Sequence, residues 1–229
     1  METVGRAAVA EFVATFALTF VGAGAVILGA QGQLDLVGIA LAHGLVLAIM
    51  VSVVGEISGG HVNPAVTIGL WVAGKVPTAR AAVYIVAQLL GGVVAALLVR
   101  FVVGEDLFET GGGGAPAMGP DVAAGTGIVL EAILTFFLVF AVFGTAVDPR
   151  GPWTKTAGFT IGLVIAFDIM AFGPLTGAAM NPARWFGPAL VAGVWDDAVV
   201  WIVGPIAGGI IASVLYATVF LRGREPATP

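Results

Sequence analysis

Six segments of this chain are long and apolar enough to cross the hydrocarbon core of a bilayer, which takes about 20 apolar residues in a helix. They lie at about 5–29, 36–55, 79–103, 122–147, 155–173 and 197–222. Because unpaired backbone groups cannot face lipid, such segments cross as α-helices. We therefore predict an all-α polytopic membrane protein that forms a single domain over residues 1–229.

The composition supports this class and argues against several others. The chain is 59% hydrophobic and 10% charged, whereas a soluble domain is about 25% charged. It has no cysteine for disulfide or thiol chemistry, and its formal charge of −5 does not suggest a nucleic-acid partner. Two histidines are too few for a metal site, and no catalytic set of Ser/His/Asp or Cys/His appears, so we expect no enzyme activity and no cofactor. The first apolar run is longer than a signal-peptide core and is expected to be retained.

The tripeptide Asn-Pro-Ala occurs twice, in "SGGHVNPAVTIGL" (58–70) and in "GAAMNPARWFGPAL" (177–190). The apolar segments that follow, about 63–73 and 181–192, are too short to cross and predict re-entrant half-helices. Asn is a favoured helix cap and Pro is favoured at the first helical position. Each tripeptide is therefore predicted to start a half-helix, with the residues Asn63, Pro64, Ala65 and Asn181, Pro182, Ala183.

The two halves of the chain resemble each other. "EFVATFALTF" from Glu11 aligns with "EAILTFFLVF" from Glu131, and "GLVLAIM" from Gly44 aligns with "GLVIAFDIM" from Gly162. Asn63 likewise aligns with Asn181, and "QLLGG" from Gln88 aligns with "PIAGG" from Pro205. The separations of these four pairs stay between 117 and 120 residues. Each half, 1–110 and 111–229, holds three spans, so the second repeat is predicted to be inverted. Inversion brings the two half-helix starts together near the bilayer midplane.

This arrangement predicts a polar centre in an apolar bundle. Each Asn can cap its own helix and still point its NH₂ group inward, and both half-helix dipoles place their positive ends there. Glycines let the preceding loops expose backbone carbonyls to the cavity. The predicted pore-lining backbone is Gly59, Gly60, His61, Val62, Gly177, Ala179 and Met180. Such a site suits a neutral, hydrogen-bonding permeant and repels cations.

Four further features have expected roles. Arg184 lies one turn after Asn181, and a buried arginine within the membrane is expected to be functional. Glu11 and Glu131 either relay protons or, as we favour, accept hydrogen bonds from the re-entrant loops and anchor them. Asp168 should face away from the pore and tie down the outer loops. Gly91, Gly92, Gly208 and Gly209 are expected to allow close helix packing, and "ETGGGGAP" (109–116) is expected to carry no chemistry.

Charges set the predicted orientation, because Lys and Arg accumulate on the cytoplasmic side. One side of the membrane carries Arg6, Lys75, Arg80, Arg150, Lys155, Arg222 and Arg224. The other carries Asp35, Glu105, Asp106, Glu109, Asp121, Asp196 and Asp197, with Arg100 nearby. Both termini are therefore predicted to be cytoplasmic. The short termini, without targeting extensions, favour a prokaryotic cell membrane over an organelle.

These motifs closely resemble the aquaporin, or major intrinsic protein, family. The resemblance covers nearly the whole chain and depends on "SGGHVNPAVTIGL", "MNPARWFGPAL", the Glu in the first and fourth spans, and the inverted repeat. It implies a channel domain over 1–229 and a homotetramer in membrane lipid with one pore per subunit. The family's four selectivity-filter positions fall on His43, Ile169, Ala178 and Arg184.

That filter resembles the plant tonoplast-intrinsic subgroup, whose members pass water and often ammonia or urea. Trp185 stands where glycerol facilitators usually have Asp, which argues against glycerol as the main permeant. Where some of the subgroup have a loop His near the filter arginine, this chain offers Asp121.

Three functions remain open. The first is a passive water channel that excludes ions and protons and leaks small neutral solutes. The second is a channel mainly for ammonia or another small solute such as urea, hydrogen peroxide or glycerol. The third is an ion-coupled secondary transporter, since such proteins also use inverted repeats and broken helices.

Overall fold

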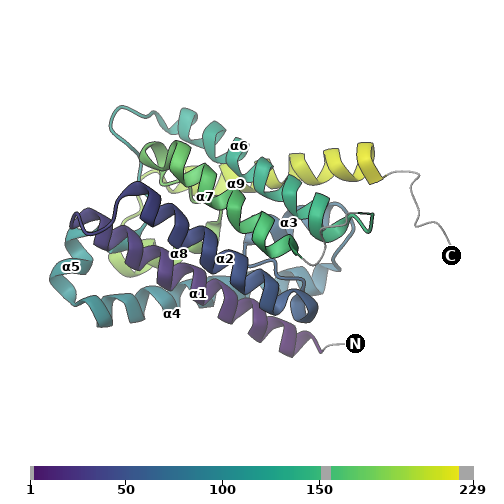
Figure 1. The fold of residues 1–229 in the computed structure, drawn as a ribbon, viewed down its shortest axis with the longest axis horizontal. Helices are drawn as coiled ribbons and strands as arrows, with labels where there is room; N and C mark the ends of the chain where they lie inside the picture. Colours follow the sequence, from purple (N-terminus) through teal and green to yellow (C-terminus); the bar gives the residue numbers. More distant parts are fainter. Residues whose placement is uncertain (1–2, 151–155, 222–229) are drawn as a thin grey trace.

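The computed structural model describes residues 3–150 and 156–221, and within them the protein is helical without β-strands. Six helices are long and apolar enough to span a membrane. They are α1 (Val4–Ala30), α2 (Leu36–Ser58), α4 (Thr78–Val103), α6 (Ala124–Val142), α7 (Ala157–Thr176) and α9 (Ala198–Leu215). The chain is thus a polytopic membrane protein, as predicted. Each span lies within a few residues of its predicted bounds when the turns that continue α6 to Val147 and α9 to Leu221 are included. The start of α1 and the end of α9 lie at the same end of the bundle (Figure 1), as an even number of spans requires.

Two shorter helices complete the bundle, and both begin where Asn and Pro predict. Helix α3 (Pro64–Val72) is capped by Asn63, and α8 (Pro182–Ala192) is capped by Asn181. In each case Pro occupies the first helical turn, where its missing N–H needs no partner. With 9 and 11 residues, neither helix is long enough to cross a bilayer.

Several elements were not predicted. Helix α5 (Glu105–Thr110) and a 3₁₀ turn, η1 (Gly112–Gly114), follow α4. Two spans end in π-helical turns, Phe143–Val147 after α6 and Tyr216–Leu221 after α9. Lys155, Arg222 and Arg224, which contribute to the predicted orientation, lie outside the described residues.

Glycines hold the helices close together. A Cβ added to Gly162 on α7 would lie 2.2 Å from the carbonyl oxygen of Gly44 on α2, and one added to Gly44 would lie 2.7 Å from that of Gly162. Equivalent backbone contacts occur at the four glycines predicted for this role: Gly91, Gly92, Gly208 and Gly209. The prediction of close packing is confirmed, because only glycine admits a neighbouring backbone at these distances.

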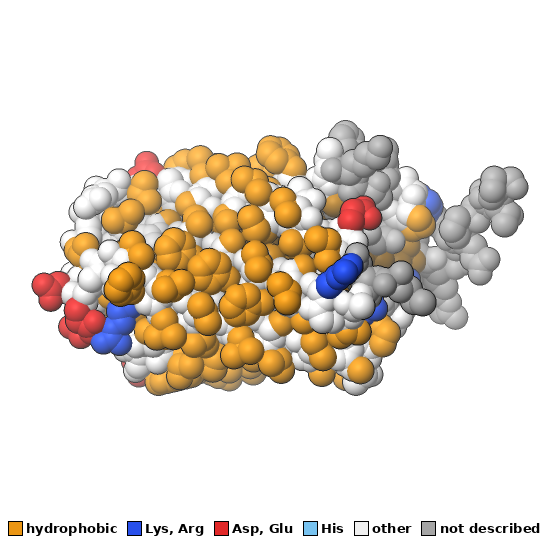
Figure 2. Space-filling view, turned by 90° about the horizontal axis from the view of Figure 1, so that it is seen from below, with side chains coloured by type: hydrophobic (Ala, Val, Ile, Leu, Met, Phe, Trp, Pro, Cys, Tyr) orange, Lys and Arg blue, Asp and Glu red, His pale blue; other side chains and the backbone are white. Residues whose placement is uncertain are grey.

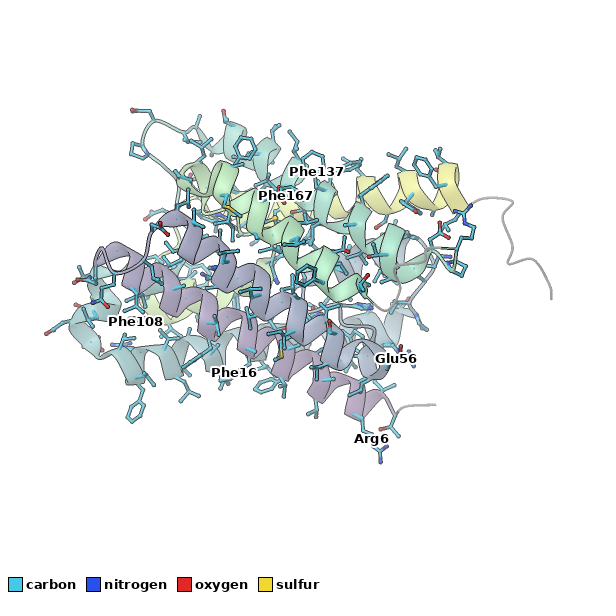
Figure 3. All side chains as sticks on the ribbon, viewed as in Figure 1. Arg6, Phe16, Glu56, Phe108, Phe137 and Phe167 are labelled. Atoms are coloured by element: carbon cyan, nitrogen blue, oxygen red, sulfur yellow. The ribbon has the colours of Figure 1, made fainter. Side chains whose placement is uncertain are left out.

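The outer surface is apolar along the length of the bundle. Figure 2 shows hydrophobic side chains across the middle of the molecule and charged ones towards its two ends. Phe137 and Phe167, labelled in Figure 3, belong to this surface, with exposures of 44% and 49%. A water-soluble protein would not expose so large an apolar area, so this surface faces lipid.

Candidate pore and selectivity filter

Glu11, buried in α1, holds the loop before α3. Its Oε1 accepts from Ser58 Oγ (2.6 Å) and from the His61 N–H (2.9 Å), and its Oε2 accepts from the Val62 N–H (2.6 Å). Gln88 on α4 adds a fourth donor to Oε2 at 2.8 Å. Two of these four donors are backbone N–H groups of the loop, which have no partner within a helix and are satisfied by the carboxyl group.

Glu131, buried in α6, holds the loop before α8 in the same way. It accepts from Thr176 Oγ1 (2.8 Å), the Ala179 N–H (2.9 Å) and the Met180 N–H (2.7 Å). Both carboxylates thus lie where the sequence places loop anchors. Pro205 aligns with Gln88, so the second site lacks the fourth donor.

An aromatic side chain donates a hydrogen bond to the backbone just before each loop. The Tyr84 hydroxyl donates to the Ser58 carbonyl at 2.8 Å, and the Trp201 indole N–H donates to the Thr176 carbonyl at 2.9 Å. All four groups are buried, so each bond replaces hydration that the interior cannot supply.

The two Asn side chains connect the loops to each other. Asn63 Oδ1 accepts from the Ala65 N–H (2.8 Å), while its Nδ2 donates to the Met180 carbonyl of the opposite loop (2.7 Å). Asn181 Oδ1 accepts from the Ala183 N–H (3.0 Å), while its Nδ2 donates to the Val62 carbonyl (3.0 Å). Each NH₂ group has two hydrogens, so one of them is left to face the cavity.

The loops contain backbone conformations that non-glycine residues rarely adopt. The φ angles are 57° at Val62, 44° at Ala178 and 50° at Met180, alongside 63° at Gly60. Each such residue costs of order 1–3 kcal/mol and persists only when its surroundings hold it. The carboxylate and Asn bonds described above hold Val62 and Met180 from both sides.

A narrow cavity of about 30 Å³ runs between the loops and the spans. Its polar lining is formed by the two Asn, Arg184, both histidines and loop backbone. Its apolar lining is formed by Leu18, Leu47, Val51, Val66, Leu138, Val142, Ile161 and Ile165.

Four of the predicted pore-lining backbone residues, Gly60, His61, Gly177 and Ala179, line the cavity together with Ala178. The carbonyls of two others, Val62 and Met180, accept hydrogen bonds from the opposite Asn, and Gly59 forms the left-handed cap of α2 with φ 95°. For these three residues a place on the pore stays a prediction.

All four predicted filter residues, His43, Ile169, Ala178 and Arg184, line this cavity. A second, wider cavity of about 250 Å³ adjoins it and shares Ile169, Gly177 and Arg184 as part of its wall. Two of the four predicted filter residues, Ile169 and Arg184, therefore lie where the larger cavity meets the smaller one.

Arg184 is buried and is held by two acceptors. Its Nε and Nη2 both donate to His43 Nε2 at 3.2 Å, and its Nη1 donates to the Gly114 carbonyl at 2.9 Å. His43 Nδ1 lies 2.8 Å from the Ile39 carbonyl. Since Nε2 accepts and Nδ1 donates, His43 is the neutral Nδ1–H tautomer. Both of its nitrogens are engaged within the protein, so its ring holds Arg184 rather than offering the permeant a polar group.

One expectation near the filter was wrong. The stretch 109–116 was expected to carry no chemistry, but its Gly114 carbonyl binds Arg184 and its Pro116 lines both cavities. Asp121, the residue offered in place of a loop His, is exposed. A backbone carbonyl leaves no mark in a sequence, which explains why Gly114 was missed.

Two neighbouring residues face away from the cavity. Trp185 is 1% exposed and its ring packs on Trp201 and Trp195, with centroids 5.7 Å away in both cases. Asp168 is buried, and within the described residues its Oδ2 has no hydrogen-bond partner. The structure gives no account of the expected tie between Asp168 and the outer loops.

Six spans, two half-helices joined at their starts by reciprocal Asn bonds, and a narrow cavity beside them define a polytopic membrane channel. The chain belongs to the major intrinsic protein family, whose profile, described as Major intrinsic protein, matches residues 2–216. It is similar to aquaporin TIP4-4 from Zea mays, with 44% identity covering 96% of this chain and 90% of the relative. It is also similar to aquaporin TIP2-1 from Arabidopsis thaliana, with 42% identity covering 96% and 89%.

A solved structure has the same fold. The aquaglyceroporin from Plasmodium falciparum superposes with a TM-score of 0.85 and 26% identity, over 95% of this chain and 97% of that one.

Proposed function

We propose that this chain is a passive water channel that excludes ions and protons and also passes small neutral solutes, ammonia foremost. The observation that carries the proposal is the pair Asn63 and Asn181, which meet at the starts of opposed half-helices on the wall of a narrow cavity. The relatives named above are aquaporins, which supports the same conclusion.

The two kinds of wall suit water in single file. Loop backbone and the remaining Asn hydrogens offer hydrogen bonds to the permeant, while the aliphatic side chains of the lining offer none. A water molecule can therefore exchange partners along the polar wall without being held strongly at any one site. Passage needs a site that binds well enough to admit the permeant and weakly enough to release it.

The same geometry disfavours cations. Both half-helices direct their N-termini, the positive ends of their dipoles, towards the centre, and Arg184 adds a fixed positive charge. A cation would also lose its hydration shell beside an aliphatic wall, which is costly when nothing replaces it.

Ammonia is the second permeant that we propose, because few side chains of the predicted filter project into the cavity. Ile169 and Ala178 present no donor, and Arg184 is drawn to His43 and Gly114. Of the five guanidinium N–H groups, three are committed to the protein. A channel mainly for ammonia, urea, hydrogen peroxide or glycerol is therefore the alternative. Trp185 in place of Asp remains an argument against glycerol.

Neither an ion-coupled transporter nor an enzyme is favoured. Coupling normally uses an ionisable carboxylate at the central site, and the described cavity wall contains no Asp or Glu. Across residues 3–150 and 156–221, no group of three His, Asp or Glu could hold a metal ion.

We further propose a homotetramer in the cell membrane, with both termini cytoplasmic and with 1–110 and 111–229 as inverted repeats. The charge asymmetry of the sequence supports this orientation. The matching anchors of Glu11 and Glu131 support the repeat.

The test compares water, ammonia and glycerol flux in proteoliposomes for the wild type and for His43→Phe with Ile169→His. The wild type should pass water rapidly, ammonia measurably and glycerol poorly. The double substitution frees Arg184 from its acceptor and adds an imidazole to the opposite wall, so water flux should persist while ammonia flux falls. An unchanged ratio of the two fluxes would show that these residues do not form the filter.

A further inference from the structure

Gly22 on α1 lies directly behind the filter. A Cβ at this buried position would stand 2.4 Å from His43 Nε2, 2.7 Å from His43 Cδ2 and 2.9 Å from Arg184 Nε. Side-chain carbons do not approach other heavy atoms so closely, so the ring and the guanidinium occupy the space that glycine leaves.

The next residue on α1 supports the other acceptor of Arg184. Gly114 has φ +67°, and a Cβ there would lie 2.5 Å from the Ala23 carbonyl oxygen. The loop residue whose carbonyl binds Arg184 is thus packed on the backbone of α1. Gly22 and Ala23 are therefore the α1 residues on which the two acceptors of Arg184, His43 and Gly114, pack.

We propose that Gly22 is a specificity-determining positioning residue of the pore, because its missing side chain lets His43 and Arg184 withdraw from the passage. This inference rests on the proposed channel function and extends the filter by a residue that touches no permeant.

The contacts around His43 determine the direction in which a side chain at position 22 would displace it. His43 Nδ1 is tied to the Ile39 carbonyl at 2.8 Å, which fixes one edge of the ring. Helix α2 cannot retreat, because Gly44 already packs on the backbone of α7 around Gly162. A methyl group at position 22 therefore pushes His43 Nε2 and Arg184 towards the cavity that both residues line.

The first experiment compares Gly22→Ala with Gly24→Ala in proteoliposomes. Gly24 lies on the same helix, and a Cβ there would meet nothing within 4 Å. Since one methylene group in a fitted site changes selectivity by roughly tenfold or more, Gly22→Ala should lower the ratio of ammonia to water permeability by about tenfold. Gly24→Ala should leave that ratio at the wild-type value. A Gly22→Ala ratio equal to that of Gly24→Ala would overturn the inference.

A second comparison tests whether the effect acts through the ring. The His43→Ala background removes the ring that the new Cβ would strike and leaves Arg184 with one acceptor fewer, so it can give way. Adding Gly22→Ala to this background should therefore change the ratio much less than it does in the wild type. If Gly22→Ala does not fold by itself, the double variant should recover a monodisperse protein. Equal loss with and without the His43 ring, in either folding or ratio, would contradict the proposal, because the two changes would then be independent.

The wild-type control separates this inference from the proposed function. If wild-type proteoliposomes conduct neither water nor ammonia, the channel function fails. If they conduct both and Gly22→Ala leaves the ratio unchanged, only the role of Gly22 fails.

Discussion

Arg184 is a buried charge whose position depends on two acceptors, His43 Nε2 and the Gly114 carbonyl. Buried arginines in membranes are costly and are normally paired with acceptors. Here both acceptors are neutral, so the guanidinium keeps its full charge beside the passage. That charge, together with the bulk of the side chain, is what the filter presents to a solute.

Replacing Arg184 with Val removes the charge and widens the passage. We expect higher permeability to small solutes, measurable cation leak and retained water flux. The measurement is cation flux and solute flux in the same proteoliposomes, with Gly24→Ala as a control. If neither leak increases, Arg184 does not lie at the constriction.

At the residue scale, the sequence predicted side chains better than it predicted backbone. His43, Ile169, Ala178 and Arg184 lie far apart in the chain, yet all line one cavity. Gly22 and Gly114 were missed because their roles depend on a missing side chain and on a carbonyl. No sequence pattern reveals that the carbonyls of Val62 and Met180 accept hydrogen bonds from Asn181 and Asn63.

Helix contacts are the next scale, and glycine determines several of them. We predict that Gly162→Ala lowers the thermal unfolding temperature in detergent, because its Cβ would lie 2.2 Å from the Gly44 carbonyl oxygen on α2. Overpacking of this kind costs roughly 1–3 kcal/mol. Gly55→Ala, on α2 with nothing within 4 Å, is the matched control and should be neutral or slightly stabilising. Equal unfolding temperatures for the two variants would refute this packing role.

A clamp at the end of α6 ties it to the end of α9. The Asp148 carboxylate accepts from the side chain and backbone N–H of Arg150 and from the Tyr216 hydroxyl (3.3 Å), while Arg150 Nη2 donates to the Phe220 carbonyl (3.0 Å). The Arg150 hydrogen bonds hold the pKa of Asp148 well below its usual range.

This lowered pKa predicts a pH dependence. A carboxyl group whose pKa falls on folding stabilises the protein above its unfolded pKa of about 3.9, and that stabilisation is lost as pH falls towards the folded pKa. Asp148→Asn should therefore lower the unfolding temperature by a constant amount between about pH 5 and 8. The difference from wild type should shrink below about pH 4. A difference that grows on acidification would contradict the clamp.

The predicted elements differed in how clearly the sequence marked them. The predicted bounds of the first half-helix, 63–73, differ from those of α3 by one residue at each end. The prediction was this close because Asn and Pro mark the start and the apolar run is short. Helix α5 was missed because six residues between glycines carry no helical periodicity. It is instead held by tertiary contacts, with Phe108 buried and Arg100 5.7 Å from its ring centroid.

At the scale of the whole molecule, the two halves hold their loops with matching hydrogen bonds, but only the second half contributes an arginine to the predicted filter. Glu11 and Glu131, Tyr84 and Trp201, and the two Asn make matching bonds. The arginine of the predicted filter, however, belongs to the second half alone, because Arg184 has no charged counterpart after Asn63: Val66 stands there. A symmetric frame is therefore predicted to carry a selective constriction at one end of the passage only.

Osmotic water permeability of proteoliposomes, followed by stopped-flow light scattering, tests the central claim most directly. We predict that vesicles containing the wild-type chain shrink many times faster than empty vesicles, with weak temperature dependence and no dependence on a proton gradient. Shrinkage no faster than that of empty vesicles at matched size would contradict the account. Flux that required a proton gradient would contradict it in favour of a coupled transporter.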